Sequence, residues 1–139
     1  MSFVLDASIA ASWFLPDEQS EAAEGLIGAL GISPGLVPSL FWFEARNLFV
    51  MAERRGRLGP GSALAATLKL RSLPLQDGGI GNDVSIIDIA LRHGLSGYDA
   101  SYVTLARSSN MPLATADRKM ATAARSEGIS IVGPLEHEH

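Results

Sequence analysis

Short apolar runs, each long enough for one buried β-strand, alternate along this chain with longer stretches whose apolar residues recur at helical spacing. The strand-like runs cover residues 2–5, 36–38, 111–115 and 129–132, and a fifth, interrupted by glycines, lies within 74–79. The helical stretches cover residues 7–15, 17–30, 39–55, 62–73, 82–93, 97–109 and 117–127. Since parallel strands are joined by such crossover helices, the alternation predicts an α/β fold, an α/β/α sandwich around a mostly parallel sheet of four or five strands.

Polar residues at the start of several helical stretches predict where those helices begin. Asp17 and Glu18 suit the first turn of the second helix, because acids there complement the helix dipole. Ser39 is the predicted N-cap of the 39–55 helix, and Asn82 or Asp83 is the predicted cap of a later one. The 39–55 helix is apolar almost all round, which predicts burial on more than one side and contact with a partner chain.

A chain of 139 residues without cysteine is expected to form one domain, at residues 1–134, whose core needs no disulfides. The lack of cysteine also excludes thiolate metal ligands. No apolar run approaches the roughly 18 residues that span a bilayer, and residues 1–4 lack the charged start of a signal peptide. We therefore expect a cytoplasmic protein without a membrane partner. The polar tail at 135–139, either native or a remnant of an expression tag, is left out of the fold prediction.

Charge is distributed unevenly along the chain. Fifteen acids against eleven bases give a net charge of −4, which by itself disfavours phosphate binding. Between residues 45 and 76 the balance is reversed, with only Glu53 opposed to Arg46, Arg54, Arg55, Arg57, Lys69 and Arg71. This basic segment could follow a phosphate backbone, or its arginines could simply favour and solvate a helix C-terminus, and the sequence leaves both interpretations open.

Three aspartates lie at the ends of predicted strands or at the start of a predicted helix. Asp6 ends the first apolar run, Asp117 follows the run before the last helix, and Asp99 lies in the first turn of the preceding helix. Each has a purely structural alternative, because Asp6 and Asp117 could cap the helices that follow them and Asp99 could form a capping box with Ser96. Taken singly, none of the three identifies a functional site.

Glu44 has no such alternative. It lies in the middle of the 39–55 helix, where a side chain cannot cap an end. Its apolar neighbours on the same stripe direct the carboxylate inward, and they are Leu40, Leu48 and Met51. Because a buried unpaired carboxylate costs several kcal/mol or titrates to its neutral form, this position indicates a nearby cation.

Together the four acids predict a metal centre. Residues just beyond the carboxyl ends of parallel strands line one crevice, and we expect Asp6, Glu44, Asp99 and Asp117 to meet there. Gathered carboxylates repel one another by on the order of 4 kcal/mol per close pair, which a divalent ion offsets. Oxygen ligands alone favour Mg²⁺, with Mn²⁺ as a substitute, over zinc. The chemistry that fits is hydrolysis of a phosphodiester bond by a metal-activated water, with these four residues as the catalytic and metal-binding set.

Four segments carry a family resemblance, in order and in spacing, to the signature segments of PIN-domain nucleases. These segments are Val4-Leu5-Asp6-Ala7-Ser8, Phe43-Glu44-Ala45-Arg46-Asn47, Tyr98-Asp99-Ala100-Ser101-Tyr102 and Ala114-Thr115-Ala116-Asp117. The likeness runs from Phe3 to about Val132, and length and layout resemble the VapC toxins of type II toxin-antitoxin pairs. The resemblance implies a Mg²⁺-dependent endoribonuclease that cuts single-stranded or loop RNA, with the four acids as its acidic set.

The resemblance also implies roles for residues around the acids. Ser8 and Thr115 match positions where the family often has a hydroxyl, and we expect them to hydrogen-bond the carboxylates, ordinary turn capping being the alternative. Asn47 matches a frequent family residue and could orient Glu44 or Arg46. Arg46 and Arg118 are the candidate substrate-binding residues.

Partners follow from the resemblance as well. A VapC-like protein implies a small antitoxin, VapB-like, whose basic segment could block the acidic pocket, and a homodimer built partly on the 39–55 helix. The alternative function is a catalytically inactive PIN-like module that binds RNA or a protein partner. Because all four acids are present, nothing in the sequence argues for the inactive form.

Other conspicuous residues are interpreted as structural. Asp88 and Arg92, four positions apart on one helix, predict an exposed ion pair. His93 precedes a glycine at a helix end, where a histidine suits the dipole. Trp13 and Trp42 are predicted to lie in the core or an interface, with RNA stacking as the alternative.

Overall fold

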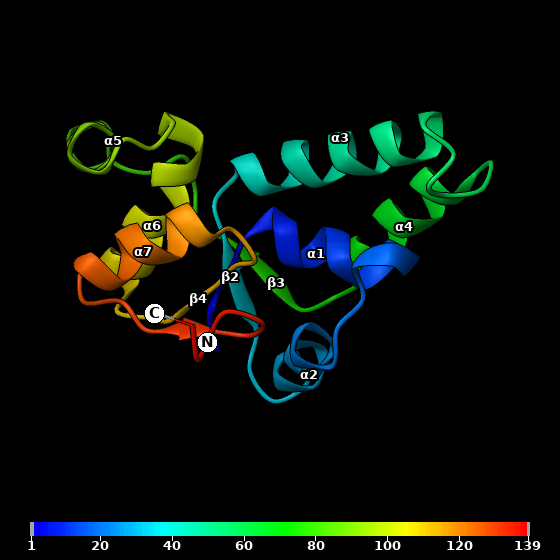
Figure 1. Ribbon diagram of the computed structural model, residues 1–139, viewed down its shortest axis with the longest axis horizontal. Helices are drawn as coiled ribbons and strands as arrows, with labels where there is room; N and C mark the ends of the chain where they lie inside the picture. Colours follow the sequence, from blue (N-terminus) through cyan, green and yellow to red (C-terminus); the bar gives the residue numbers. More distant parts are fainter. Residues whose placement is uncertain (1, 139) are drawn as a thin grey trace.

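The computed structural model describes residues 2–138 and contains a sheet of five parallel strands. Along the sheet the strands follow the order β3-β2-β1-β4-β5 (Figure 1). Their bounds are β1 Val4–Leu5, β2 Gly35–Val37, β3 Leu75–Asp77, β4 Leu113–Ala114 and β5 Ile131–Val132. In the central strand, Val4 pairs with Leu36 on one side and with Leu113 on the other. The predicted α/β class is confirmed, and every strand pair is parallel.

Helices cover both faces of this sheet. They are α1 Ala7–Phe14, the short 3₁₀ turn η1 Pro16–Glu18, α2 Glu21–Leu30, α3 Leu40–Arg54, α4 Ser62–Arg71, α5 Asp83–His93, α6 Gly97–Ser109 and α7 Arg118–Ser126. Right-handed crossovers place α1 to α4 on one face and α5 to α7 on the other, because the chain moves one way along the sheet from β1 to β3 and the opposite way from β3 to β5. Figure 1 shows the two groups on either side of the strands. The direction changes between β1 and β4, which is the switch point of the sheet.

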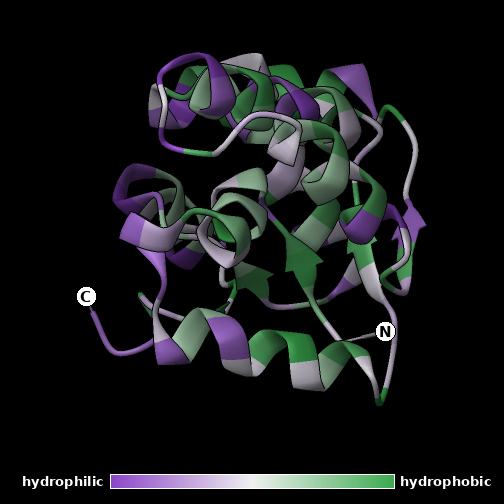
Figure 2. Cartoon of the chain, turned by 90° about the vertical axis from the view of Figure 1, so that its right-hand side faces the viewer, coloured by the Kyte–Doolittle hydropathy of each residue, from purple (hydrophilic) through white to green (hydrophobic). Residues whose placement is uncertain are grey.

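The inner strands are apolar on both sides because helices cover both faces. Every residue of β1, β2 and β4 is buried, whereas β3, at the edge, is mostly exposed. Figure 2 shows the inner strands in green between helices of mixed colour. The predicted core position of Trp13 is confirmed, since its side chain is buried and its Nε1 donates to the Ala23 carbonyl at 2.7 Å. Leu135 is also buried in this core.

One predicted helix start and one predicted side-chain cap are wrong. Asp17 and Glu18 lie in η1, and α2 begins only at Glu21, after Ser20 caps it by accepting from the Ala23 N–H. Pro16 closes α1 and starts a separate turn, because its ring prevents α1 from continuing. Ser39 does not cap α3: its backbone is already helical, and its hydroxyl donates instead to Asp77 Oδ1 at 2.7 Å.

The predicted cap at Asn82 is confirmed, since its side chain accepts from the Ser85 N–H. Among residues 2–138, no helix is long and apolar enough to cross a membrane.

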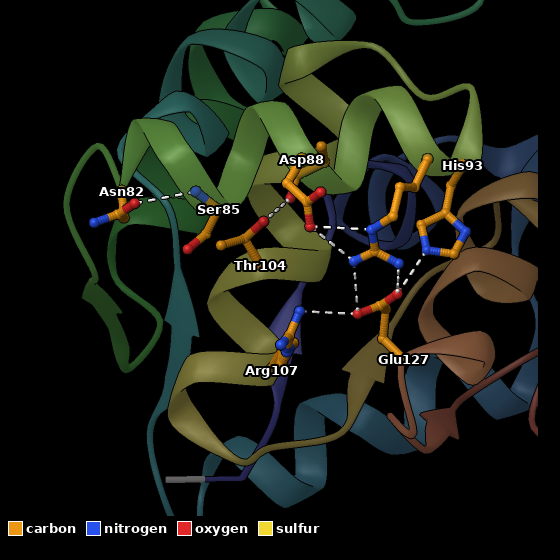
Figure 3. Close-up of polar contacts among 9 residues, drawn as sticks. Asn82, Ser85, Asp88, His93, Thr104, Arg107 and Glu127 are labelled. Carbon is orange, nitrogen blue, oxygen red and sulfur yellow. Dashed lines mark hydrogen bonds and ion pairs between the residues drawn. The ribbon is translucent and has the colours of Figure 1, made fainter.

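A charged cluster centred on Glu127 fastens α5 and α6 to the end of α7 (Figure 3). Arg92, His93 and Arg107 each donate to the Glu127 carboxylate, at 2.8, 2.7 and 2.9 Å. The predicted pair of Asp88 and Arg92 is confirmed at 2.9 Å. Hydrogen bonds from Arg92 and His93 hold the pKa of Glu127 at about 2, well below its ordinary range.

Replacing Glu127 with Gln is expected to lower the Tm by about 3 to 8 °C near neutral pH, because three basic side chains lose their shared carboxylate. A depressed pKa means that this stabilisation is present above the ordinary value of 4.5 and is lost as the pH falls toward 2. The difference in Tm between wild type and E127Q should therefore shrink over that interval in circular dichroism melts. Asp88→Asn, which removes only an exposed partner of Arg92, is the matched control and should have a smaller effect. An undiminished difference at the acid end would contradict this assignment.

Candidate active site

Asp6 is a buried carboxylate held by two hydroxyl groups. It follows β1 directly and is 5% exposed. Ser8 Oγ and Thr115 Oγ1 both donate to its Oδ2, at 2.6 and 2.8 Å. Although Asp6 occupies the N-cap position of α1, its side chain makes no capping hydrogen bond, so the structural alternative for this residue is wrong. The carboxylate is directed to the edge of the sheet instead.

The same hydroxyls join the end of β1 to the loop that follows β4. Ser8 Oγ accepts from the Ala116 N–H, and Thr115 Oγ1 accepts from the Asp117 N–H, both at 3.0 Å. Asp117 then caps α7, its Oδ1 accepting from the Met120 N–H. The capping alternative therefore holds for Asp117, whose position is fixed by the cap.

Glu44 and Asp99 come from opposite helical layers. Glu44, on α3, is partly buried and its Oε1 accepts from the Tyr102 hydroxyl at 2.6 Å. Asp99 lies in the first turn of α6, where Ser96 caps the helix by accepting from the Asp99 N–H. Burial raises the pKa of Tyr102, so the phenol stays protonated and donates to Glu44. Sequence patterns had assigned no role to Tyr102 beyond its place in a family segment. The available signal was that a phenol buried in a helix face needs a hydrogen-bond partner.

All four acids line one cavity of about 290 Å³ at the carboxyl edge of the sheet. The other residues that line it are Ala7, Ser8, Ala11, Leu15, Glu18, Leu48, Met51, Ala52, Arg55 and Arg57. A larger hollow of about 430 Å³ lies elsewhere, but its carboxylate, Glu127, is engaged by the basic cluster described above. The smaller cavity is therefore the candidate site.

The surroundings of the acids in this cavity disfavour their ionised form. Burial raises the pKa of Asp6 to about 6, and the charges of Glu44 and Asp99 add to that rise. Burial also raises the pKa of Glu44 and of Asp99, with repulsion from Asp99 acting on the former and from Asp117 on the latter. The acids thus lie close enough to repel one another.

The donor set fits a divalent cation, because oxygen ligands that repel one another are what such an ion neutralises. As they are placed within residues 2–138, however, no three His, Asp or Glu side chains stand close enough to hold a metal between them. Binding would have to draw the carboxylates together, a movement that their repulsion opposes until a cation is present.

Of the predicted neighbours, only the two hydroxyl residues lie in the site. Asn47 is exposed and makes none of the side-chain hydrogen bonds found in the described chain, so nothing orients Glu44 or Arg46 through it. Arg46 lies over the Phe43 ring at 5.2 Å, and Arg118 pairs with Glu138 at 2.9 Å. None of these three lines the cavity.

Fold and site together define a class of α/β protein whose parallel sheet opens, at its switch point, into an acidic cavity. The family model described as PIN domain matches residues 3–126. Ribonuclease VapC3 of Pyrobaculum aerophilum is 32% identical over 130 residues, which cover 87% of this chain and 93% of that protein. The chain therefore belongs to the PIN-domain family, and the resemblance to its VapC-type members is confirmed.

One solved structure agrees with this at the level of the fold. The crystal structure of PAE2754 from Pyrobaculum aerophilum aligns with a TM-score of 0.71 and 24% identity, over 88% of this chain and 79% of that one. At this identity the likeness concerns the fold alone.

Replacing Asp6 with Asn is expected to stabilise the metal-free protein near pH 8 by about 2 to 3 kcal/mol. Folding raises the pKa of Asp6 from 3.8 to about 6, so it favours the protonated acid and wild-type stability falls as the pH rises between those values. The amide oxygen of Asn can accept both hydroxyl hydrogen bonds without a charge, so the variant should not lose stability there. Urea unfolding in EDTA, near pH 4 and near pH 8, measures the difference.

Asp83→Asn, at an exposed position in the first turn of α5, is the control and should change stability by less than about 1 kcal/mol at either pH. If Asp6→Asn were instead less stable than wild type near pH 8 without metal, Asp6 would be a structural carboxylate.

Proposed function

We propose that this protein is a metal-dependent endoribonuclease that hydrolyses RNA phosphodiester bonds in the cytoplasm as the VapC-like toxin of a toxin-antitoxin pair. The observation that carries the proposal is the convergence of Asp6, Glu44, Asp99 and Asp117 on one cavity. Family membership and the similarity to a protein named as a ribonuclease support it. A purely structural cluster of acids would lower stability without benefit.

In this proposal the four acids bind Mg²⁺, with Mn²⁺ as a possible substitute. The ion would lower the pKa of a bound water and neutralise charge on the phosphate oxygens. Ser8 and Thr115 hold Asp6 by its Oδ2, which leaves Oδ1 without a hydrogen bond among the described contacts. Tyr102 fixes Glu44 in the same way through Oε1. These hydroxyls keep the carboxylates oriented, which limits the reorganisation that cation binding requires.

RNA cleavage by the wild type is expected to need Mg²⁺, to stop in EDTA and to fall more than about 100-fold in Asp6→Asn and in Asp99→Asn. Gel analysis of total RNA and of single-stranded oligonucleotides measures the activity, and circular dichroism checks the fold. Asp88→Asn, an acid outside the cavity, should cut like the wild type. Wild-type protein that bound RNA but did not cut it with Mg²⁺ or Mn²⁺ would support the inactive PIN-like module instead.

The proposed partners are an antitoxin and a second copy of the chain. An antitoxin with a basic segment would complement the acidic cavity and keep RNA out of it. For the homodimer, α3 offers exposed apolar side chains, with Phe43 63% and Val50 39% exposed. Such residues on the surface of a helix are typical of an interface.

Phe43→Asp is expected to raise the dimer dissociation constant at least tenfold, because it places a charge in the apolar contact. Sedimentation equilibrium at tens of micromolar measures the monomer fraction. Ile32→Asp, at a position that is 91% exposed before β2, is the control and should leave dimerisation unchanged. Wild-type protein that stayed monomeric at these concentrations would rule out the homodimer.

A further inference from the structure

The acidic cavity has a second, basic end. One stripe of α3 faces it, made of Glu44, Leu48, Met51 and, at the C-cap, Arg55. These positions are spaced by three or four residues and so lie on one side of the helix. At about 1.5 Å of rise per residue, Arg55 lies roughly 16 Å along the axis from Glu44. The stripe between them is apolar, so a ligand that contacts both ends must be long.

Of the two arginines at the basic end, one is already neutralised. Arg57 Nη2 lies 3.0 Å from Asp17 Oδ1 and also pairs with Glu18, which fastens the turn after α3 to η1. Arg55 is exposed and takes part in none of the ion pairs found in residues 2–138. Its guanidinium is therefore available to a ligand in the cavity.

We infer that Arg55 binds a backbone phosphate of the RNA strand several nucleotides away from the phosphodiester held at the acidic end. The inference rests on the proposed function, because it assigns a second contact to the same substrate. A stacked strand advances about 3.4 Å per nucleotide, so 16 Å corresponds to about five nucleotides. The guanidinium fork matches phosphate oxygens, and a polyanion in a cavity lined by five acids needs such a cation.

Arg54 is the matched control that distinguishes phosphate binding by Arg55 from a general role of a cation at the helix C-terminus. Both arginines are exposed at the C-terminal end of α3, where either one suits the helix dipole. Arg54 contacts Met51 Sδ at 3.6 Å but does not line the cavity. A dipole role predicts the same consequences for the loss of either charge, whereas a phosphate contact predicts weaker RNA binding only when Arg55 is changed.

RNA binding measured without cleavage tests the inference. The probe is a labelled single-stranded RNA of about twelve nucleotides, followed by fluorescence anisotropy in the Asp99→Asn background. Arg55→Gln should raise the Kd about tenfold and lower the slope of log Kd against log salt by about 0.7, the value for one phosphate contact on a single strand. Arg54→Gln should change neither quantity. Arg55→Lys should keep the salt slope but bind less tightly than wild type, because it keeps the charge and loses the fork.

A small substrate provides the second readout. With Asp99 restored, Arg55→Gln should impair hydrolysis of RNA more than hydrolysis of bis(p-nitrophenyl) phosphate, because the small diester does not reach the basic end. Equal impairment of both substrates would contradict the inference. For RNA, Arg55→Gln should raise KM and leave kcat nearly unchanged.

The outcomes separate this inference from the proposed function. Equal weakening by Arg54→Gln and Arg55→Gln, or an unchanged Kd and salt slope in Arg55→Gln, overturns the inference even if the wild type cuts RNA. Binding that depends on Arg55, in a wild type that does not cut RNA, supports the phosphate contact and counts against the proposed nuclease activity alone.

Discussion

Four carboxylates that converge on one cavity, with Asp6 buried and the other three partly buried, are the constraint on which the rest of this structure depends. β1 and β4 are parallel neighbours, so Asp6, which follows β1, emerges beside Thr115 and Asp117, which follow β4. The strand order reverses at this same point of the sheet. Burial raises the pKa of Asp6, and the two hydroxyl hydrogen bonds offset that rise only in part. Such a site is tolerated as an anion chiefly when a cation is near, which connects the topology of the sheet to the proposed chemistry.

A hydrogen bond between side chains connects the two helical layers at this edge. Tyr102 belongs to α6 and Glu44 to α3, and the Tyr102 hydroxyl donates to Glu44 Oε1 at 2.6 Å. Further along α3, the ion pairs of Arg57 hold the helix end against η1. Residues of α3 thus line the cavity at both its acidic and its basic end, as the proposed contact with an extended polyanion would require.

Glu127 shows the opposite electrostatic arrangement in the same molecule. Cations outnumber the acid there, its pKa is lowered, and the cluster is complete without any ligand. In the cavity the acids outnumber the arginines, and the pKa of Asp6 is raised. Both are clusters of titratable groups, but the pKa is lowered at Glu127 and raised at Asp6. The direction of the pKa shift therefore distinguishes an ion-pair cluster that joins helices from a site whose negative charge lacks a partner.

The sequence by itself determined the order of strands and helices and the four acids, because strand-length runs, helical spacing and a charge on an apolar stripe are local signals. It failed in the side-chain cap assigned to Ser39, whose hydroxyl found a distant acceptor, and at the start of α2, where a proline turn intervenes. Only the tertiary structure decided that Asp6 accepts hydroxyls instead of capping α1, and that Arg55, not Arg118, lines the cavity. Those facts depend on how elements that are far apart in the sequence pack together. The partner of a side chain is set by distance in space, and local spacing along the sequence does not determine that distance.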